Sequence, residues 1–418
     1  REAAETGSGR LGRRTPRAVP PREVLVRLHT TRRGLHAVAF EELFPGRRRA
    51  LPAHLLRLQR QGTAVPFHLE PATATFGPGG VLFFHADAGP ASTDFAPEVA
   101  WELVRSTEGT PMPVAAAPPT GPGIGASASA TAAFEVNRVY QPGLLDAPDP
   151  WLWDGMASGV ARVKPFALSG LDSASARDAE LAVDLVGGSD SPAVSGDHHV
   201  RVSVNGIDVG EAVFDGKRPH RLEAAVPATL LREGPNELAV VNVGDTGAVS
   251  LVFLDRFTLT WPSPPALRGG AFEGAWPEGG TAEVQAGAPP AAIVDVTDAA
   301  GARWLTGHET SGGAVRFRAE PGRRYLVAAR EGLLSPRVAR AAPTSLLDPS
   351  NRADYLLVAP REMLAAAAPL LERREAQGLA ARAVAFEEIA EVFGHGRPSA
   401  EAIRAFVVLK QARPTGEA

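Results

Sequence analysis

The sequence predicts a mainly β protein, in which tandem antiparallel β domains and β-sandwiches are followed by a truncated α/β domain. Three observations predict this class. Residues 160–262 carry about seven strand patterns with turn residues between them, which is typical of a sandwich. Residues 263–345 repeat the pattern on a smaller scale. From Asp354 onward an apolar strand alternates with helical patterns, which indicates parallel βα units.

The composition is that of an ordinary globular protein, and it excludes several classes. The 418 residues are 44% hydrophobic and 22% charged, and this length suffices for several domains. The net charge of −4 argues against a nucleic-acid partner, which would favour a basic excess. Because no run of about 18 apolar residues occurs, we expect no transmembrane segment. The sequence contains no cysteine, so it supplies no disulfide, thiolate metal ligand or thiol nucleophile.

Changes in composition along the chain predict its domain organisation. Residues 1–22 hold Arg, Gly, Pro and Ser without periodicity, which predicts a disordered lead-in. Since the sequence starts at Arg1 and stops at Ala418 just after a helical pattern, we expect a processed or cut start and an arbitrary stop. The other predicted segments are a small antiparallel β domain at 23–110, a linker at 111–133, a β-sandwich at 134–262, a small immunoglobulin-like sandwich at 263–345 and the start of an α/β domain at 354–418.

Short strands with turn residues predict the first β domain. Residues 24–28 form a strand pattern with one partly polar face, and a short helix pattern follows at 40–44. The sequence Gln61-Gly62-Thr63 lies between two strand patterns and predicts a hairpin, in which Gly supplies the positive φ of the turn. Residues 111–133 are rich in Pro, Gly, Ala and Ser with almost no charge, which predicts a linker or long surface loop.

Alternating patterns predict the larger sandwich. Residues 179–186 alternate apolar and polar side chains, and so do residues 199–204, which run into Asn205-Gly206. This dipeptide is a strong hairpin signal. Asp215-Gly216 predicts a second turn, and residues 249–261 supply a long last strand.

The pattern changes at Asp354. Residues 355–359 form a continuous apolar run of the kind buried in a parallel sheet. A helix pattern opens after Pro360 and closes at Gly378, and we expect Pro369 to bend it. A strand at 381–385 and helices at 386–393 and from Ser399 on complete the pattern. Because two strands cannot cover the apolar faces of these helices, we expect a continuation of the domain.

Three stretches of this segment resemble the start of the catalytic domain of gingipain-like cysteine peptidases. They are the strand at 353–359, the helix end at 372–379 with its Arg-rich pattern before Gln377-Gly378, and residues 388–406, which include Phe393-Gly394-His395-Gly396-Arg397-Pro398. The resemblance implies a caspase-like α/β fold and a secreted or surface endopeptidase that cleaves proteins or peptides through a His/Cys dyad. Upstream, the β-rich stretch resembles the N-terminal parts of multidomain bacterial relatives through softer patterns.

No catalytic residue can be carried over from the family to this chain. The resemblance places both dyad residues beyond the matched segment, and the sequence has no cysteine. His395 lies in the turn after the second helix, at a variable place of the family pattern. We therefore expect no catalytic residue here and a chain that is proteolytically inactive alone.

Other site chemistry receives little support. Asp197-His198-His199 and His220 could supply imidazoles to a metal, but successive residues of a strand point to opposite faces, so we expect exposed histidines at a strand start. Residues 121–125 are Gly-rich but follow no strand and open no helix, so we expect no phosphate loop. Neither a G-x-S-x-G nor an H-E-x-x-H motif occurs. We predict no cofactor and no metal; calcium stays open at two aspartate pairs, Asp295 with Asp298 and Asp245 with Asp255.

A competing interpretation is a module for glycan or cell-surface attachment. The sandwich resembles jelly-roll modules, some of which bind carbohydrate, although fold alone does not imply function. Phe253, Phe257 and Trp261 are spaced four apart, so we expect them to share one face of the last strand, either as a sugar platform or as core. Trp151 and Trp153 leave the same two alternatives open, and core packing is favoured in both cases.

Overall fold

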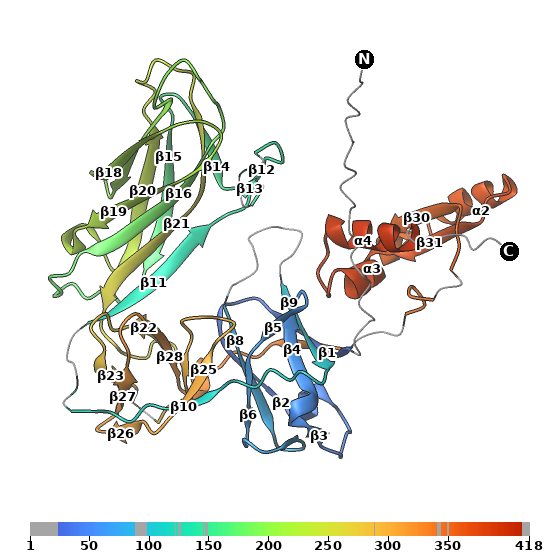
Figure 1. The fold of residues 1–418 in the computed structure, drawn as a ribbon, viewed down its shortest axis with the longest axis horizontal. Coiled ribbons are helices and arrows are strands. Elements are labelled where there is room, and N and C mark those ends of the chain that lie inside the picture. Colours follow the sequence, from blue (N-terminus) through green and yellow to red (C-terminus); the bar gives the residue numbers. More distant parts are fainter. Residues whose placement is uncertain are drawn as a thin grey trace, which may run out of the picture.

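The computed structural model describes residues 24–87, 98–121, 123, 127–144, 146, 149–287, 289–340, 344–348 and 351–411. These residues form antiparallel β domains followed by a short α/β segment (Figure 1), so the mainly β class predicted from the sequence is confirmed. The predicted lead-in at 1–22 lies outside the described residues.

The N-terminal β domain consists of two sheets packed around an apolar core. Leu28, Phe40, Phe84 and Leu103 are fully buried between them. One sheet has the order β29-β1-β9-β4-β5, the second has the order β2-β8-β6, and β3 pairs with β7. The elements are β1 (Val24–Thr30), β2 (Gly34–Ala39), α1 (Phe40–Leu43), β3 (Leu51–Pro52), η1 (Ala53–Leu55), β4 (Leu56–Arg60), β5 (Thr63–Val65), β6 (Phe67–Glu70), β7 (Thr75–Phe76), β8 (Val81–Ala86), β9 (Val99–Arg105) and, much later in the chain, β29 (Arg337–Ala339).

The hairpin predicted at Gln61-Gly62 is present between β4 and β5, and both residues have positive φ, 49° and 81°. The strand pattern that follows this hairpin is split at Pro66. Proline has no N–H to donate to a ladder, so the chain leaves the first sheet there, and β6 joins the second sheet.

A small β domain packs around Trp276, Val284, Phe317 and Val327. Its strands form the order β10-β25-β24-β28-β22 on one side and β23-β27-β26 on the other. Residues 111–133, expected as a linker, contain β10, which pairs in parallel with β25, and the start of β11. Backbone pairing thus draws this segment into the sheet. The elements are β10 (Val114–Ala116), β22 (Ala271–Ala275), β23 (Gly280–Gln285), β24 (Ala292–Asp295), β25 (Arg303–Thr306), β26 (Glu309–Ser311), β27 (Ala314–Ala319), β28 (Arg324–Ala328) and η3 (Arg330–Gly332).

The sandwich is inserted in the chain between β10 and β22. One sheet has the order β11-β21-β16-β19 with β14 on β21, and the other has the order β15-β20-β17-β18. Val183, Val202, Val240 and Phe257 are fully buried between them. The elements are β11 (Ala128–Glu135), β12 (Val139–Tyr140), β13 (Trp151–Leu152), β14 (Asp154–Ala157), β15 (Ala161–Leu168), β16 (Ala179–Gly187), β17 (His198–Val204), β18 (Ile207–Phe214), β19 (Pro219–Val226), η2 (Ala228–Leu230), β20 (Gly234–Asn242) and β21 (Leu251–Ser263).

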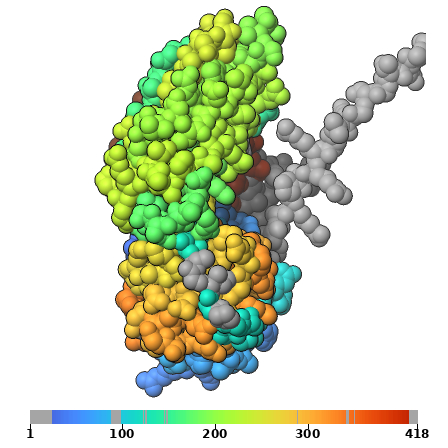
Figure 2. Space-filling view, turned by 90° about the vertical axis from the view of Figure 1, so that its left-hand side faces the viewer, coloured from blue at the N-terminus to red at the C-terminus, as the bar shows by residue number. Residues whose placement is uncertain are grey.

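Backbone pairing connects the β domains. Ser129 of β11 pairs with Ala275 of β22, so one ten-stranded sheet runs from the small β domain into the sandwich. Figure 2 shows the sandwich in green and yellow stacked end to end on the gold and orange small β domain. The chain then returns to its start, because β29 pairs with the edge of β1.

The C-terminal α/β segment contains β30 (Tyr355–Ala359), η4 (Arg361–Met363), α2 (Ala368–Ala376), β31 (Ala381–Ala385), α3 (Phe386–Phe393) and α4 (Ala400–Gln411). The two strands pair in parallel, as predicted. Pro369 does not bend a longer helix: it lies in the first turn of α2, where a missing N–H breaks no hydrogen bond. Gly378 follows α2 with φ +84°, and Ser399 caps α4 by accepting from the amide of Ala402 at 3.1 Å.

Candidate functional site

The outer face of the five-stranded sheet carries a row of polar side chains. Arg27 of β1 and Gln59 of β4 both lie directly opposite Glu102 of β9 in register. Alternation along the strands turns these residues away from the apolar core. On an uncovered sheet they would face water, yet only 7% of the Arg27 side chain and 4% of the Glu102 side chain is exposed. Something therefore covers this face.

The cover is the turn that follows α3 in the α/β segment. His395 lies 293 positions after Glu102, and its Nδ1 is 2.9 Å from Oε2 of that carboxylate. A carboxylate can only accept, so Nδ1 of the imidazole is the donor. Arg27 donates from its guanidinium to the carbonyl oxygen of Glu391 at 2.6 Å, near the end of α3. Gln59 donates to the same Glu102 oxygen at 2.9 Å.

These contacts shift two ionisation equilibria in opposite directions. Burial by itself would raise the pKa of Glu102, but the hydrogen bonds from His395 and Gln59 and the charges of His395 and Arg27 outweigh it, so this pKa is lowered. The hydrogen bond to Glu102 raises the pKa of His395, against burial and the charge of Arg27. The site thus favours a charged imidazolium–carboxylate pair.

His395 was not expected to be catalytic, and the structure gives it a partner in the N-terminal β domain. The chain contains no cysteine, so it supplies no thiol that this imidazole could activate. The contact between His395 and Glu102 was missed by reasoning from sequence. The one available signal was the polar face of the first strand, and polar strand faces usually point to solvent.

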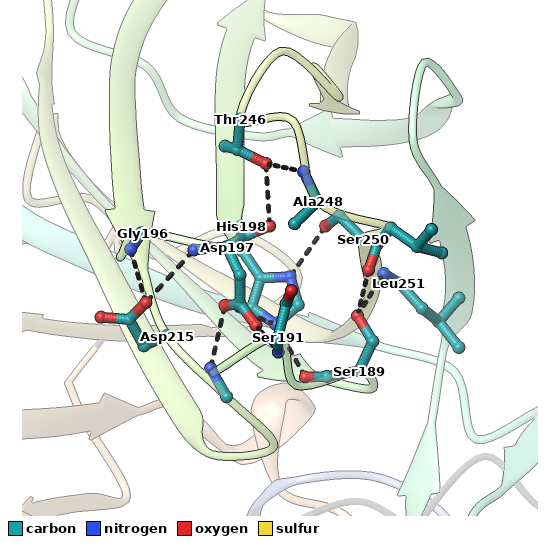
Figure 3. Close-up of polar contacts among 12 residues, drawn as sticks. Ser189, Ser191, Gly196, Asp197, His198, Asp215, Thr246, Ala248, Ser250 and Leu251 are labelled. Carbon is teal, nitrogen blue, oxygen red and sulfur yellow. Dashed lines mark hydrogen bonds and ion pairs between the residues drawn. The ribbon is translucent and has the colours of Figure 1, made fainter. Parts of the chain in front are cut away.

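The histidines considered as metal ligands do not converge. His198 is fully buried; its Nδ1 is 2.7 Å from the hydroxyl of Ser250, and its Nε2 is 3.2 Å from the carbonyl oxygen of Ser189 (Figure 3). His199 contacts Asp245 at 2.8 Å on the other face, and the ring of His220 stacks on a phenylalanine. The expectation of opposite faces is confirmed, but the expectation of exposed histidines is wrong for His198, since partners from other segments satisfy its imidazole. The His199 side chain is only 14% exposed.

The network around His198 binds loops of the sandwich together. Asp197 is buried and accepts from the amide of Ser191 at 2.7 Å (Figure 3). It also accepts from the amide of Gly216 at 3.0 Å. Asp215 accepts in turn from the amides of Gly196 and Asp197. Although Ser250, His198 and Asp197 are the residue types of a hydrolytic triad, none is more than 2% exposed. A substrate could not reach this serine, so the network is structural.

The aspartates considered for calcium have other partners. Asp295 is buried and accepts from Arg303 and from Arg323, each at 2.6 Å, while Asp298 accepts from the amide of Ala300 in a turn. The partner of Asp245 is His199, as described above. Within the described ranges no group of three or more His, Cys, Asp or Glu side chains is arranged to hold a metal ion.

Burial is the main cause that raises the pKa of Asp255 to about 6. Nearby acidic groups add to this rise, and the positive charge of Arg256 opposes it. Asp255 is a bulge in β21. Arg256 pairs with Asp184 and Leu254 pairs with Leu185, so Asp255 has no partner on β16. An extra residue reverses the inward and outward alternation beyond it.

The bulge corrects the expected common face of three aromatic residues. Phe257 and Trp261 point into the core of the sandwich, whereas Phe253 packs on the opposite side with Leu144 and Leu152. All three are buried, so they form no sugar platform. Trp153 is also buried in the core, which is the alternative that the sequence favoured.

The Gly-rich stretch and the question of a transmembrane segment were also raised by the sequence. Residues 122, 124 and 125 of the Gly-rich stretch lie outside the described residues. Among helices in the part of the chain that the structure describes, none is both long and apolar enough to cross a membrane.

Comparisons with known proteins find a family match for the C-terminal segment. The model described as Peptidase family C25 matches residues 348–415. A search of curated proteins finds no match. Among solved structures, dimeric latent PorU from Porphyromonas gingivalis is similar over 94% of this chain, with 15% identity and a TM-score of 0.58. The chain spans 40% of the length of that protein.

Shorter similarities cover about a third of the chain. The carbohydrate-binding module CBM36, solved with calcium and xylotriose, covers 32% of this chain at 13% identity and a TM-score of 0.21, with 92% of the module matched. A family 35 carbohydrate binding module from an environmental isolate covers 33% at 16% identity and the same score, with 93% of that module matched. Scores this low carry no argument about function.

The family match falls on the strand and helices that carry the motifs quoted above, and the fold of nearly the whole chain is that of the latent PorU structure. The C-terminal segment of this chain therefore matches the model of peptidase family C25, and its predicted resemblance to gingipain-like cysteine peptidases is confirmed.

Proposed function

We propose that this chain is the N-terminal portion of a gingipain-like cysteine endopeptidase that acts at the cell surface or outside the cell. The observation that carries the proposal is the match of residues 348–415 to peptidase family C25. The fold similarity over 94% of the chain supports it. Protein or peptide substrates follow from the family.

The 418 residues alone are proteolytically inactive in this proposal. Cysteine peptidase chemistry needs a thiolate and a neighbouring imidazole, and the sequence supplies no thiol. The described β domains instead position the α/β segment. The strand β29, which precedes this segment in the chain, pairs with β1, and the turn at His395 contacts the N-terminal β domain.

The coding DNA beyond Ala418 gives the first test. We expect further βα units with a His and a Cys at strand ends within about 150–200 residues, since a complete domain of this class needs that length. The extended protein should cleave a peptide library, and iodoacetamide should abolish the activity. A continuation without Cys, or an extended protein whose cleavage survives alkylation, would overturn the proposal.

A second candidate function, glycan attachment through the sandwich, is favoured by one observation. Tyr140 is 54% exposed, and its ring centroid lies 4.9 Å from that of the partly exposed Trp151 on the β12–β13 hairpin. Exposed aromatic pairs can stack on sugars. Loss of a glycan-array signal in Trp151→Ala, with the signal kept in the more distant surface variant Val213→Ala, would support this function. The absence of any array signal for the wild type would remove it.

A further inference from the structure

The turn between α3 and α4 is seated directly on the sheet of the N-terminal β domain. A Cβ atom added to Gly396 would lie 3.0 Å from Cδ of Arg27 and 3.2 Å from Cβ of Ala100. Gly396 has φ +83°, so its lack of a side chain permits both the turn and the close approach. The backbone of the α/β segment thus touches β1 and β9 without a gap.

His395 holds an unusual conformation at this point. Its φ is +54°, a region in which a non-glycine residue is uncommon and strained. Gly would fit the turn with less strain, but it would lose the hydrogen bond to Glu102. The local strain is therefore offset by the contact that the imidazole makes across the two parts of the chain.

The charges around this contact form one cluster. The charged groups that the structure places against His395 are Glu102 on β9 and Arg27 on β1. Arg27 lies 3.4 Å from Glu102 and 3.8 Å from the carboxylate of Glu391 on α3. Gln59 on β4 adds a neutral donor. When His395 is protonated, the N-terminal β domain contributes Arg27 and Glu102, and the α/β segment contributes one cation and one anion of its own, His395 and Glu391. When His395 is neutral, the α/β segment loses its cation.

We propose that the His395–Glu102 contact, with Arg27 beside it, is a pH-sensitive latch that holds the C-terminal α/β segment on the N-terminal β domain and loosens at alkaline pH. The latch is independent of the proposed peptidase function, and its test needs no peptidase assay.

The direction of the pH effect follows from linkage. The pKa of His395 is raised in the docked state, so its contribution is fully present below the ordinary value of about 6.5 and disappears as the pH rises through the docked pKa. The lowered pKa of Glu102 keeps that carboxylate ionised at pH 5.5. The window for a test is thus pH 5.5 to 9.

Hydrogen exchange of the full 418-residue chain tests the latch. After correction for intrinsic exchange rates, protection of the amides of α3 should fall about fivefold from pH 5.5 to pH 9, the size expected for one partly exposed ion pair. His395→Gln removes the charge from a half-exposed position and should show the low protection at both pH values. His199→Gln, which removes a histidine paired with Asp245 on the sandwich, is the matched control and should behave as the wild type.

A second measurement reads the histidine itself. The imidazole signal of His395 in an NMR titration should have its midpoint above 6.5 in the wild type and a lower midpoint in Glu102→Gln. If wild type and His395→Gln show the same protection at pH 5.5, or if the midpoint of His395 is not raised, the latch is refuted. His395→Gln keeps the test decisive even if Glu102→Gln fails to fold.

Discussion

Glu102 and His395 are 293 positions apart in the sequence, and their side chains meet at 2.9 Å. The pair joins β9, the central strand of the sheet order β29-β1-β9-β4-β5, to a turn of the α/β segment. The polar outer face of that sheet is therefore covered by another part of the same chain.

Glu102 is expected to contribute strongly to the stability of the N-terminal β domain. Glu102→Gln leaves Arg27 buried without its close anion, and breaking a buried pair costs about 3 kcal/mol. Native-state hydrogen exchange of β1 and β9 at pH 7 should report this loss. Glu98→Gln is the matched control, since the partner Arg337 is largely exposed, and it should cost less than about 1 kcal/mol. Equal losses in the two variants would contradict the burial argument.

Local features of the fold were predictable because their causes are local. Asn205 and Gly206 have φ of 48° and 85°, as the hairpin signal requires, and Ser399 caps its helix within three residues. Contacts such as that of His395 with Glu102 have causes at distant points of the chain. A polar strand face predicts solvent, and no local pattern tells that a later turn covers it.

Two other predictions failed for related reasons. The shared face of Phe253 and Phe257 assumed an unbroken strand, but the bulge at Asp255 shifts the alternation. The exposure of His198 was argued from its place at a strand start, but Ser250 and Ser189 supply its hydrogen bonds. In each case a pairing partner outside the local sequence decides the outcome.

Asp255 is expected to lower the stability of the sandwich at neutral pH. Its pKa is raised to about 6 by burial, so the folded state holds a proton more firmly than the unfolded state does. Stability is therefore lost as the pH rises from about 4 to 6, by about 2–3 kcal/mol at the usual conversion of 1.36 kcal/mol per pKa unit. Asp255→Asn should raise the free energy of unfolding at pH 7.5, measured by hydrogen exchange of β16 and β21, and leave it nearly unchanged at pH 4. A gain of the same size at both pH values would point to a cause other than ionisation.

His198 and His199 are neighbours that should respond differently to substitution. His198→Ala removes a fully buried ring and leaves Ser250 without one of its partners, so a loss of about 3 kcal/mol is expected. His199→Ala removes a partner of the exposed Asp245 and should cost about 0.5 kcal/mol or less. Hydrogen exchange of β17 in both variants measures the contrast. Losses that do not differ would mean that the network at Ser189 and Ser250 contributes little.

The α/β segment is expected to be the least protected part of this chain. Every residue of β30 is only half-buried, whereas β16 and β21 contain fully buried residues such as Val183 and Leu254. A sheet of two strands gives helices little surface to pack on, and regions with few buried contacts open first. Amides of β30 and β31 should therefore exchange faster than those of β16 and β21, even at pH 5.5 where the latch is closed. Equal protection would contradict this ranking. In a longer chain that adds strands to this sheet, the same amides should become more protected, because the open faces of β30 and β31 would then be covered.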